Sequence, residues 1–401
     1  MAGDGLDLLD EAKSLLPRAV EMRRRIHMHP ELGNDLPETK ATVMEAIGDL
    51  DLDLAFSEQT SGIVATLEGA RPGPTILLRG DMDALPMTED TGLDFASKVD
   101  GRMHACGHDA HTAMLATAAR LLSGHRERLA GRVKFMFQPG EEGPGGAKPM
   151  IDEGVLDHGG APDAAFALHV FPNFKSGVVA CRPGPVLAAA DQVKIRILGR
   201  GGHGSMPYTA NDPVPVACEL VQAMLTFITR RIKTFDPAVL SVGLIRAGTV
   251  NNVIPAHAEM ECTLRSFSDE TRDLAHAGLT RLAENIAAAH EMSAEITIDE
   301  GYPVTTNDGP FSDFVAKTAR GLLGDKGYVE MSEPVMGSED FSYVLQRTEG
   351  AFAFLGAAPD GVDPVTAPTC HSNFMMIDEE AMAAGIAMHA AVACRYLGAQ
   401  N

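Results

Sequence analysis

Several residue types are scarce in this chain of 401 residues: tryptophan is absent, aromatic residues make up 5%, and there are 6 cysteines. The cysteines are too few and too irregularly spaced for a disulfide-stapled scaffold, so that class of secreted domain is excluded. The scarcity of aromatic residues gives no basis for predicting an aromatic-lined pocket. Four cysteines are expected to be packing residues: Cys181, Cys218, Cys262 and Cys394.

Positive charge is also scarce, because 33 lysines and arginines are outnumbered by 55 aspartates and glutamates, which gives a formal net charge of −22. Such an excess of negative charge argues against nucleic acid or an anionic membrane as a partner. No apolar run approaches the roughly 18 residues that span a bilayer. The N-terminal residues lack the basic and apolar stretches of a signal peptide. We therefore expect a cytoplasmic protein.

Apolar residues, by contrast, are plentiful at 45%, enough for a sizeable core, and the length is typical of two domains. Short apolar segments that alternate with helical patterns predict an α/β fold, in which a mixed, largely parallel sheet is flanked by helices. The predicted strands are 62–67, 75–79, 133–138 and 165–170, the predicted helices are 6–29, 39–50 and 109–122, and a turn is predicted at 71–74.

The character of the sequence changes near residue 188. Strands are predicted at 192–198, 239–247 and 258–265, and helices at 214–233 and 270–292. This order is typical of a small α+β unit. We therefore predict a catalytic domain formed by residues 1–187 and 301–401, with residues 188–300 inserted as a separate domain.

Metal-binding residue types are concentrated in segment 103–111, Met-His-Ala-Cys-Gly-His-Asp-Ala-His, which holds a thiol and three imidazoles. Cys106 and His108 stand at the start of a predicted helix, where the helix dipole lowers the pKa of a thiol and favours the thiolate that binds a metal. Sulfur, imidazole and carboxylate together are ligands of transition metals. The alternative is a buried cysteine beside a structural histidine.

An adjacent pair of carboxylates, Glu141 and Glu142, follows the predicted strand 133–138. Side chains of adjacent residues diverge on an irregular loop, so one can bind metal while the other acts as a base toward metal-bound water. The spacing does not decide which residue has which role, and a solvated acidic turn is the alternative. Other predicted strands lead to Asp81 and to His169, and ligands of α/β sheets collect at this edge.

Candidate substrate-binding residues lie outside these segments. His203 is flanked by glycines, which let the backbone approach a ligand closely, and Asn252 lies in a loop between strands. Arg265 ends a strand and is able to bind a carboxylate through two hydrogen bonds. Gly337 and Ser338 begin a polar segment that a helix N-cap alone would also explain. Turn formation alone would explain His203 and Asn252, and surface exposure alone would explain Arg265.

The order of these motifs along nearly the whole chain resembles the M20 metallopeptidase superfamily. The resemblance is to its amidohydrolase branch of hippurate hydrolases, N-acyl-amino-acid aminohydrolases and auxin-conjugate hydrolases. Each motif alone is weak evidence, but eight motifs in one order are strong evidence. The motifs lie at 79–86, 103–111, 137–143, 169, 199–207, 252–255, 337–341 and 371–372.

The resemblance implies a two-metal centre and a general base. The expected ligands are Cys106, His108, Glu142, His169 and His371, and the expected base is Glu141. The two divalent ions are expected to be zinc, which thiolate and imidazole suit, or else manganese, cobalt or nickel. Bound metal lowers the pKa of a bridging water, and the base transfers a proton of that water to the leaving amine.

The resemblance also implies that the inserted domain is a lid that mediates dimerisation, in a homodimer or a higher homo-oligomer. His203 and Asn252 are then expected to reach a substrate across the dimer, and to stabilise the oxyanion or bind a carboxylate. The chain departs from its relatives at Tyr208, where histidine is common, at Gly140, where alanine is common, and at Asn251. These departures lie on the substrate side and leave the identity of the substrate open.

We therefore predict a metal-dependent amidohydrolase that cleaves the amide bond of an N-acyl amino acid or a related small conjugate. Asp81 stands where many superfamily members have histidine and is not expected to be a ligand, whereas Asp83 is expected to support one. Two alternatives remain. One is a metallo-exopeptidase, a dipeptidase or carboxypeptidase. The other is a metal-stabilised protein that binds conjugates without turnover, and the presence of Glu141 argues against it.

Overall fold

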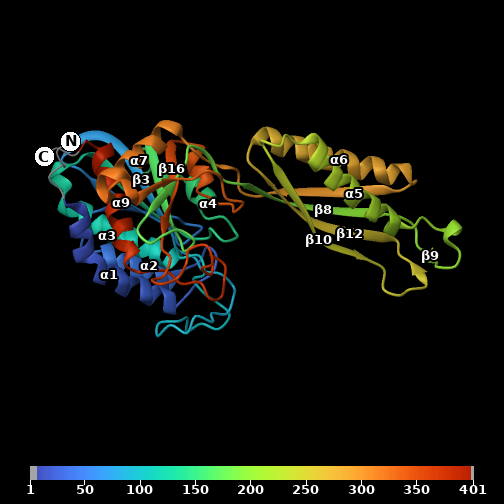
Figure 1. Cartoon of the computed structure of the whole chain (residues 1–401), viewed down its shortest axis with the longest axis horizontal. Coiled ribbons are helices and arrows are strands. Elements are labelled where there is room, and N and C mark those ends of the chain that lie inside the picture. The colour runs from blue at the N-terminus through green and yellow to red at the C-terminus, as the bar shows by residue number, and fades with distance from the viewer. Residues whose placement is uncertain (1–6, 399–401) are drawn as a thin grey trace. The chain divides into compact units, whose positions relative to one another are not determined.

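The computed structural model describes residues 7–398 and divides into two compact units. Unit 1 contains the described residues up to Val186, Thr306–Glu333, and the described residues from Asp340 onward. Unit 2 contains Leu187–Thr305 and Pro334–Glu339. In Figure 1 the chain completes most of unit 1, forms unit 2 with its middle part, and returns. Leu6, the first residue of the predicted N-terminal helix, lies outside the described residues.

Unit 1 is built on a mixed sheet that has eight strands among the described residues, in the order β1-β2-β4-β3-β5-β16-β6-β15. The central strands β4, β3, β5 and β16 are parallel neighbours, whereas β1–β2, β2–β4 and β16–β6 are antiparallel pairs. The prediction of a mixed, largely parallel sheet flanked by helices is confirmed. The strands are β1 (Asp53–Phe56), β2 (Ile63–Glu68), β3 (Arg71–Asp81), β4 (Ala130–Gln138), β5 (Ala164–Phe171), β6 (Val179–Cys181), β15 (Tyr328–Glu330) and β16 (Glu349–Gly356).

Helices pack on the central strands of this sheet. α3 and α9 contact β3 and β5, and α1 packs across α3 and α9. Because α3 is enclosed by these elements, nearly every one of its residues is buried. The helices of unit 1 are α1 (Leu8–Met28), α2 (Pro37–Ile47), α3 (His108–Gly124), α4 (Ala147–Asp152), α7 (Gly309–Leu323), α8 (Ser342–Leu345) and α9 (Ala381–Tyr396), with short 3-10 helices at Arg126–Arg128, Val155–Asp157 and Asp325–Gly327.

Prolines affect two predicted elements of unit 1 differently. The sequence predicts that Pro17 interrupts or restarts the first helix, but α1 continues through it, with Pro17 on the exposed side. The predicted turn at 71–74 is wrong, because β3 already begins at Arg71. Its pairing with β4 is irregular over this stretch, and the irregularity admits Pro72 and Pro74, which lack the amide hydrogen of a regular ladder.

Unit 2 is an α+β unit. Its antiparallel sheet has the order β10-β12-β8-β13, and α5 and α6 pack against one face. Alternate residues of β8, namely Val193, Ile195 and Ile197, are buried in the core with these helices, whereas the residues between them are exposed. The elements are β8 (Ala189–Leu198), β9 (Gly202–His203), a 3-10 helix (Pro207–Thr209), α5 (Pro213–Arg231), β10 (Ala238–Ala247), β11 (Val253–Ile254), β12 (His257–Ser266), α6 (Asp269–Ala289) and β13 (Ser293–Glu300).

Two further short strands are β7 (Gly184–Leu187) and β14 (Thr305–Asn307). Within the described part of the chain, no helix is both long and apolar enough to cross a membrane.

Candidate metal centre

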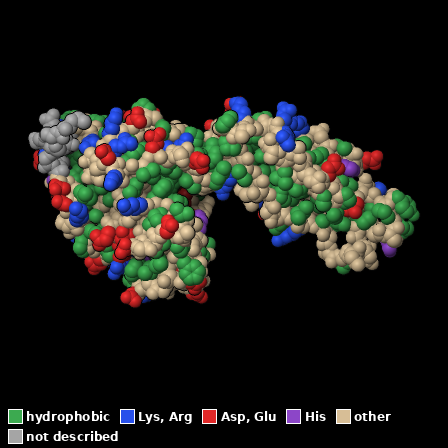
Figure 2. Space-filling model, viewed as in Figure 1, with side chains coloured by type: hydrophobic (Ala, Val, Ile, Leu, Met, Phe, Trp, Pro, Cys, Tyr) green, Lys and Arg blue, Asp and Glu red, His purple; other side chains and the backbone are tan. Residues whose placement is uncertain are grey.

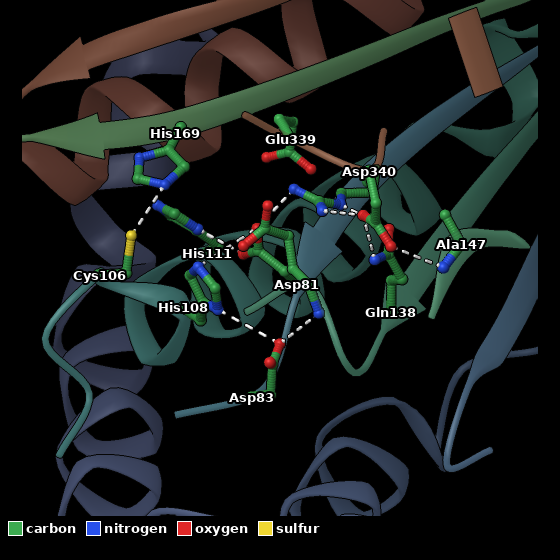
Figure 3. Close-up of polar contacts among 12 residues, drawn as sticks. Asp81, Asp83, Cys106, His108, His111, Gln138, Ala147, His169, Glu339 and Asp340 are labelled. Carbon is green, nitrogen blue, oxygen red and sulfur yellow. Dashed lines mark hydrogen bonds and ion pairs between the residues drawn. The ribbon is translucent and has the colours of Figure 1, made fainter. Parts of the chain in front are cut away.

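The candidate site lies at one edge of the sheet of unit 1, where three parallel strands end. β3 ends at Asp81, β4 leads into the loop 139–146 that carries the glutamate pair, and β5 carries His169 near its end. Parallel neighbours place their carboxyl ends at the same edge, so residues distant in sequence meet there. Figure 3 shows Asp81 and His169 together with Cys106 and His108.

The structure brings all five expected metal ligands together in two overlapping groups. The ligand atoms of Cys106, His108 and His169 lie within 4.8 Å of one another, and so do those of Cys106, Glu142 and His371. Cys106 Sγ lies 3.4 Å from Nε2 of His169. Oε1 of Glu142 lies 3.2 Å from Nε2 of His371. Two triads that share one thiol have a layout suited to two neighbouring cations.

Several polar atoms at the site are buried without a hydrogen-bond partner. They include both ring nitrogens of His108 and Oε1 of Glu142, and His108 is 0% exposed. Leaving a buried polar group unpaired costs about 1–3 kcal/mol, and such groups in native proteins usually face an ion or a water. The donor set, a thiol, imidazoles and a carboxylate, therefore fits a divalent transition metal.

Two backbone positions with positive φ hold the ligand segments. Gly107 has a φ of 88° just before α3, and a Cβ added there would lie 2.3 Å from Cγ2 of Val170, so only glycine fits at this position. His371 has a φ of 68°, which is uncommon for a residue other than glycine. Its N–H donates to O of Ala105 at 2.7 Å. This bond attaches the His371 loop to segment 103–111.

Asp83 joins the glutamate pair to His108. Its Oδ1 atom accepts from the backbone N–H of Glu141 and its Oδ2 atom from that of Glu142, each at 3.0 Å. Oδ1 also lies 3.4 Å from Nδ1 of His108, a contact that Figure 3 marks. Asp83 is 1% exposed, so water hardly competes for it. One carboxylate therefore fixes the loop of the expected base and orients an expected ligand.

Asp81 is held by Arg79 and His111, neither of which sequence reasoning assigned. Nδ1 of His111 and Nη1 of Arg79 each lie 2.5 Å from a different oxygen of Asp81. Nε2 of His111 accepts from the N–H of Val170 at 2.7 Å, so Nδ1 carries the proton and donates it to Asp81. Asp81, His108 and His111 are also close enough to hold a metal, but these bonds already engage both oxygens of Asp81. The available signal for His111 was its position one helical turn after His108.

The expectation that the pKa of the Cys106 thiol is lowered is wrong. A hydrogen bond with the Cys370 side chain, burial, and the charges of Glu142 and Glu141 raise the pKa of Cys106 well above its usual range. A thiolate at this position therefore needs a cation close by, because the positive charge of a metal reverses the effect of the neighbouring carboxylates.

The pKa values of other ligands depart from their ordinary values in opposite directions. Burial opposes protonation of His108, but the neighbouring aspartates raise its pKa to about 10. Burial and adjacent imidazoles lower the pKa of His169 well below its ordinary value. Burial opposes ionisation of Glu142, but the neighbouring imidazole of His371 lowers its pKa. A cation that binds here must therefore displace a proton from His108, and its affinity falls as the pH falls.

In unit 2 the structure brings His203 and Asn252 together. β9 pairs with β11, and the N–H of Gly204 donates to O of Asn252 at 2.8 Å. Nδ1 of His203 accepts from the N–H of Ser205 at 3.2 Å and lies 2.8 Å from its hydroxyl. A backbone N–H only donates, so the neutral ring carries its proton on Nε2. His203 is exposed and has this N–H to offer to a ligand.

Arg265, Gly337 and Ser338 also belong to unit 2. Arg265 lines a hollow of about 540 Å³ on the exposed side of the sheet, and its Nη1 atom is buried without a hydrogen-bond partner. The carbonyl of Gly337 accepts from the N–H of Ala188 at 2.8 Å. The helix N-cap alternative for Ser338 is wrong, because the next helix begins at Ser342 and has no side-chain cap.

Residues 77–395 match the family described as Peptidase family M20/M25/M40. The chain belongs to this family. It is 36% identical over 393 residues to Thermostable carboxypeptidase 1 of Saccharolobus solfataricus, covering 97% of this chain and 98% of the relative. It is 32% identical over 392 residues to the hippurate hydrolase of Campylobacter jejuni, covering 98% and 100%.

A solved structure agrees with the M20 assignment. The YXEP protein of Bacillus subtilis, a dinuclear metal binding peptidase from the M20 family, matches with a TM-score of 0.82 and 32% identity, covering 96% of this chain and 99% of that one. The resemblance inferred from the motifs is confirmed. The chain is a metal-dependent hydrolase of amide bonds, and the metals are divalent.

Proposed function

We propose that this M20 hydrolase cleaves the amide bond of N-acyl amino acids. The observation that carries the proposal is that the carboxylate of Asp83 accepts hydrogen bonds from the backbone N–H groups of Glu141 and Glu142. These bonds hold both residues beside the thiol and imidazole donors. A metal ligand and a carboxylate base on adjacent residues are what hydrolysis by an activated water requires. The similarity to a hippurate hydrolase, whose name denotes an N-acyl amino acid substrate, supports this substrate class.

We assign the metal-binding role to Cys106, His108, Glu142, His169 and His371. When bound, two divalent cations supply a more acidic water and polarise the scissile carbonyl. Thiolate and imidazole donors favour zinc, and manganese, cobalt or nickel are the other candidates. The absence of disulfides among the described cysteines supports a cytoplasmic location.

Glu141 is assigned as the general base. It is 7% exposed, and its backbone is fixed by Asp83, so its carboxylate has a restricted range of positions. The carboxylate takes a proton from the attacking water and returns it to the amine nitrogen as the amide bond breaks. Glu142, the adjacent residue, has a side chain directed to His371 at 3.2 Å, which leaves the base role to Glu141.

Residues of unit 2 are assigned to the substrate. The Nε2–H of His203 is suited to donate to the oxyanion that forms from the scissile carbonyl. Asn252 and the unpaired guanidinium nitrogen of Arg265 are suited to bind the substrate carboxylate. Gly337 and Ser338 are assigned to the substrate by their place in the motif order alone. We further propose that unit 2 acts as a lid.

We also propose that the chain is a homodimer and that unit 2 forms the interface. Within the described residues, β10 is an edge strand that pairs only with β12. Long unpaired edges are templates for pairing with a second chain. Exposed hydrophobic side chains accompany this edge, among them Phe235, Val239 and Ile245. Figure 2 shows hydrophobic side chains exposed on the visible face of unit 2.

A panel of substrates tests the proposed function. N-acetyl, N-benzoyl and longer N-acyl amino acids are compared with free dipeptides, after the protein is loaded with zinc, manganese or cobalt. Chelator-sensitive release of amino acids from the acylated set is the expected result. Cleavage of dipeptides alone would instead support an exopeptidase, the second candidate, which the 36% identity to a thermostable carboxypeptidase favours.

Turnover of neither set by a protein that binds metal would contradict the proposal. It would support either an unusual amide substrate or a binding protein without turnover.

A further inference from the structure

Cys370 is a thiol that the proposed function does not use, although it stands next to His371. It is partly exposed, and its Sγ atom lies 4.0 Å from O of Val170. The same carbonyl accepts from Nδ1 of His169 at 2.7 Å. The other ring nitrogen of His169 lies 3.4 Å from Sγ of Cys106. Both sulfurs therefore lie beside the same pair of residues at the end of β5.

The sulfur atoms of Cys106 and Cys370 lie against adjacent residues, His169 and Val170. The backbone brings them together, because the N–H of His371 donates to O of Ala105 at 2.7 Å. This bond connects the peptide unit after Cys370 to the peptide unit before Cys106. The Cα atoms of the two cysteines are thus the ends of two hydrogen-bonded peptide units. A disulfide needs Cα atoms about 4.4–6.8 Å apart, a separation that such an arrangement suits.

We propose that Cys106 and Cys370 form a reversible disulfide that prevents metal from binding at this site. The proposal rests on the proposed function, in which Cys106 is a metal ligand. A sulfur in a disulfide has no thiolate charge to offer to a cation. The oxidised state and the metal-loaded state therefore exclude each other, and bound metal protects Cys106 from oxidation.

The oxidant is a small disulfide such as oxidised glutathione. The thiolate of Cys370, the more exposed of the two, attacks one sulfur of the oxidant, forms a mixed disulfide and releases one glutathione. The thiol of Cys106 then attacks the sulfur of Cys370, and its proton passes to the leaving sulfur as the second glutathione is released. The two protein thiols lose two electrons and two protons, and the two released glutathione thiols carry them.

The experiment uses the full chain, either loaded with zinc or depleted of metal by a chelator that is then removed. Each form is incubated with oxidised glutathione, free thiols are alkylated, and mass spectrometry of peptides detects a link between Cys106 and Cys370. Zinc binding is then measured before and after reduction with a phosphine. Cys370→Ser removes one partner, and Cys218→Ser, which changes an exposed cysteine of unit 2, is the matched control.

The metal-depleted chain is expected to form the link and to lose at least about tenfold in bound zinc, as thiolate loss from a metal site implies, with recovery after reduction. The zinc-loaded chain is expected to resist oxidation. Cys370→Ser is expected to keep its zinc binding through the same treatment, and Cys218→Ser to behave as the natural chain does. Cys370→Ala repeats the test if the serine variant does not fold.

Two results would overturn the proposal. One is a glutathione adduct on Cys370 without a link to Cys106 in the metal-depleted chain. The other is loss of zinc by the reduced Cys370→Ser and Cys370→Ala variants, which would make Cys370 a ligand instead. Failure of the ligand assignment is distinguishable, because Cys106→Ala would then retain zinc while the natural chain still formed the link.

Discussion

The carboxylate of Asp83 accepts the backbone N–H of Glu141 at 3.0 Å and is 1% exposed. A side chain two residues beyond the end of β3 thereby fixes a loop that follows β4. This bond engages the backbone N–H of Glu141 and not the carboxylate of that residue. The backbone N–H of Glu141 therefore positions this residue, whereas its carboxylate is assigned the proton transfer.

Asp83→Asn replaces one acceptor oxygen by an NH₂ group, which cannot accept a hydrogen bond. The backbone N–H of either Glu141 or Glu142 therefore loses its acceptor. We expect kcat to fall by about 10–100-fold, the usual effect of losing a group that orients a metal ligand, with a smaller change in KM. Steady-state kinetics with a measurement of bound metal checks this. Asp94→Asn, at an exposed aspartate of unit 1, is the control. Equal kinetics in the two variants would show that Asp83 does not position the loop.

Glu141→Gln keeps the size of the side chain and removes its basicity. Turnover is expected to fall by about 10²–10⁴-fold, while bound metal stays the same because the ligands are unchanged. Activity assays and metal analysis of the same preparation test both parts. Glu58→Gln, at an exposed glutamate, should leave both unchanged. Near-normal turnover by Glu141→Gln would remove its role as the base.

Cys106→Ala removes the thiol shared by the two ligand triads. We expect fewer metal ions per subunit and an affinity for the remaining metal reduced by at least about tenfold. Metal analysis after equilibrium dialysis gives both quantities. Cys218→Ala is the control, because this cysteine is exposed and the expectation that it is a packing residue is wrong. A full complement of metal in Cys106→Ala would contradict its assignment as a ligand.

His203→Ala and Glu141→Gln are each expected to be nearly inactive as homodimers. If His203 serves the active site of the partner subunit, a mixed dimer has one site with both residues intact. Co-expression with two different tags isolates the mixed dimer, and roughly half of the natural activity per dimer is expected, since one of two sites works. Inactive mixed dimers of verified composition would place His203 in the site of its own subunit.

His27 forms a buried pair with Asp109, with 2.8 Å between Nδ1 and Oδ2. Burial opposes protonation, but Asp109 raises the pKa of His27 to about 9. A pKa above the unfolded value of about 6.5 means that the stabilisation is complete below pH 6.5. It is lost as the pH rises through 9. Between pH 6.5 and pH 9, the free energy of unfolding of the natural chain should then decrease by about 2–3 kcal/mol more than that of His27→Gln.

Chemical unfolding at pH 6 and pH 9.5 measures this difference. His158→Gln, at an exposed histidine of the same unit, should keep the pH dependence of the natural chain. An identical pH dependence in His27→Gln would mean that the His27 pair contributes nothing.

The fold class and the clustering of the site were predictable because both follow from local patterns. Apolar runs that end in polar residues predicted the central strands β3, β4 and β5, but the central strand β16 was not predicted. The parallel arrangement then placed His169 near Cys106. β13 was not predicted, although its residues alternate between polar and apolar. The predicted helix 270–292 extends to the residue before β13, whereas α6 itself ends at Ala289.

The contacts that support the site were harder to predict. The bonds of Arg79 and His111 to Asp81 join residues up to 30 positions apart through the packing of α3 on β3. The raised pKa of Cys106 depends on Cys370, and these two residues are much farther apart in the sequence. A helix start can be predicted from a sequence, whereas the burial and the neighbouring charges that raise the pKa of Cys106 exist only in the folded chain.

Because α3 is buried along nearly its whole length, His108 at its first position and Cys106 just before it cannot leave the site by local fraying. Opening α3 would require separating it from the sheet and from α1 and α9 together, a disruption comparable to unfolding unit 1. The geometry of Cys106 and His108 is therefore as long-lived as the fold itself. Destabilising mutations far from the site should lower the number of active molecules and leave the turnover of each one unchanged.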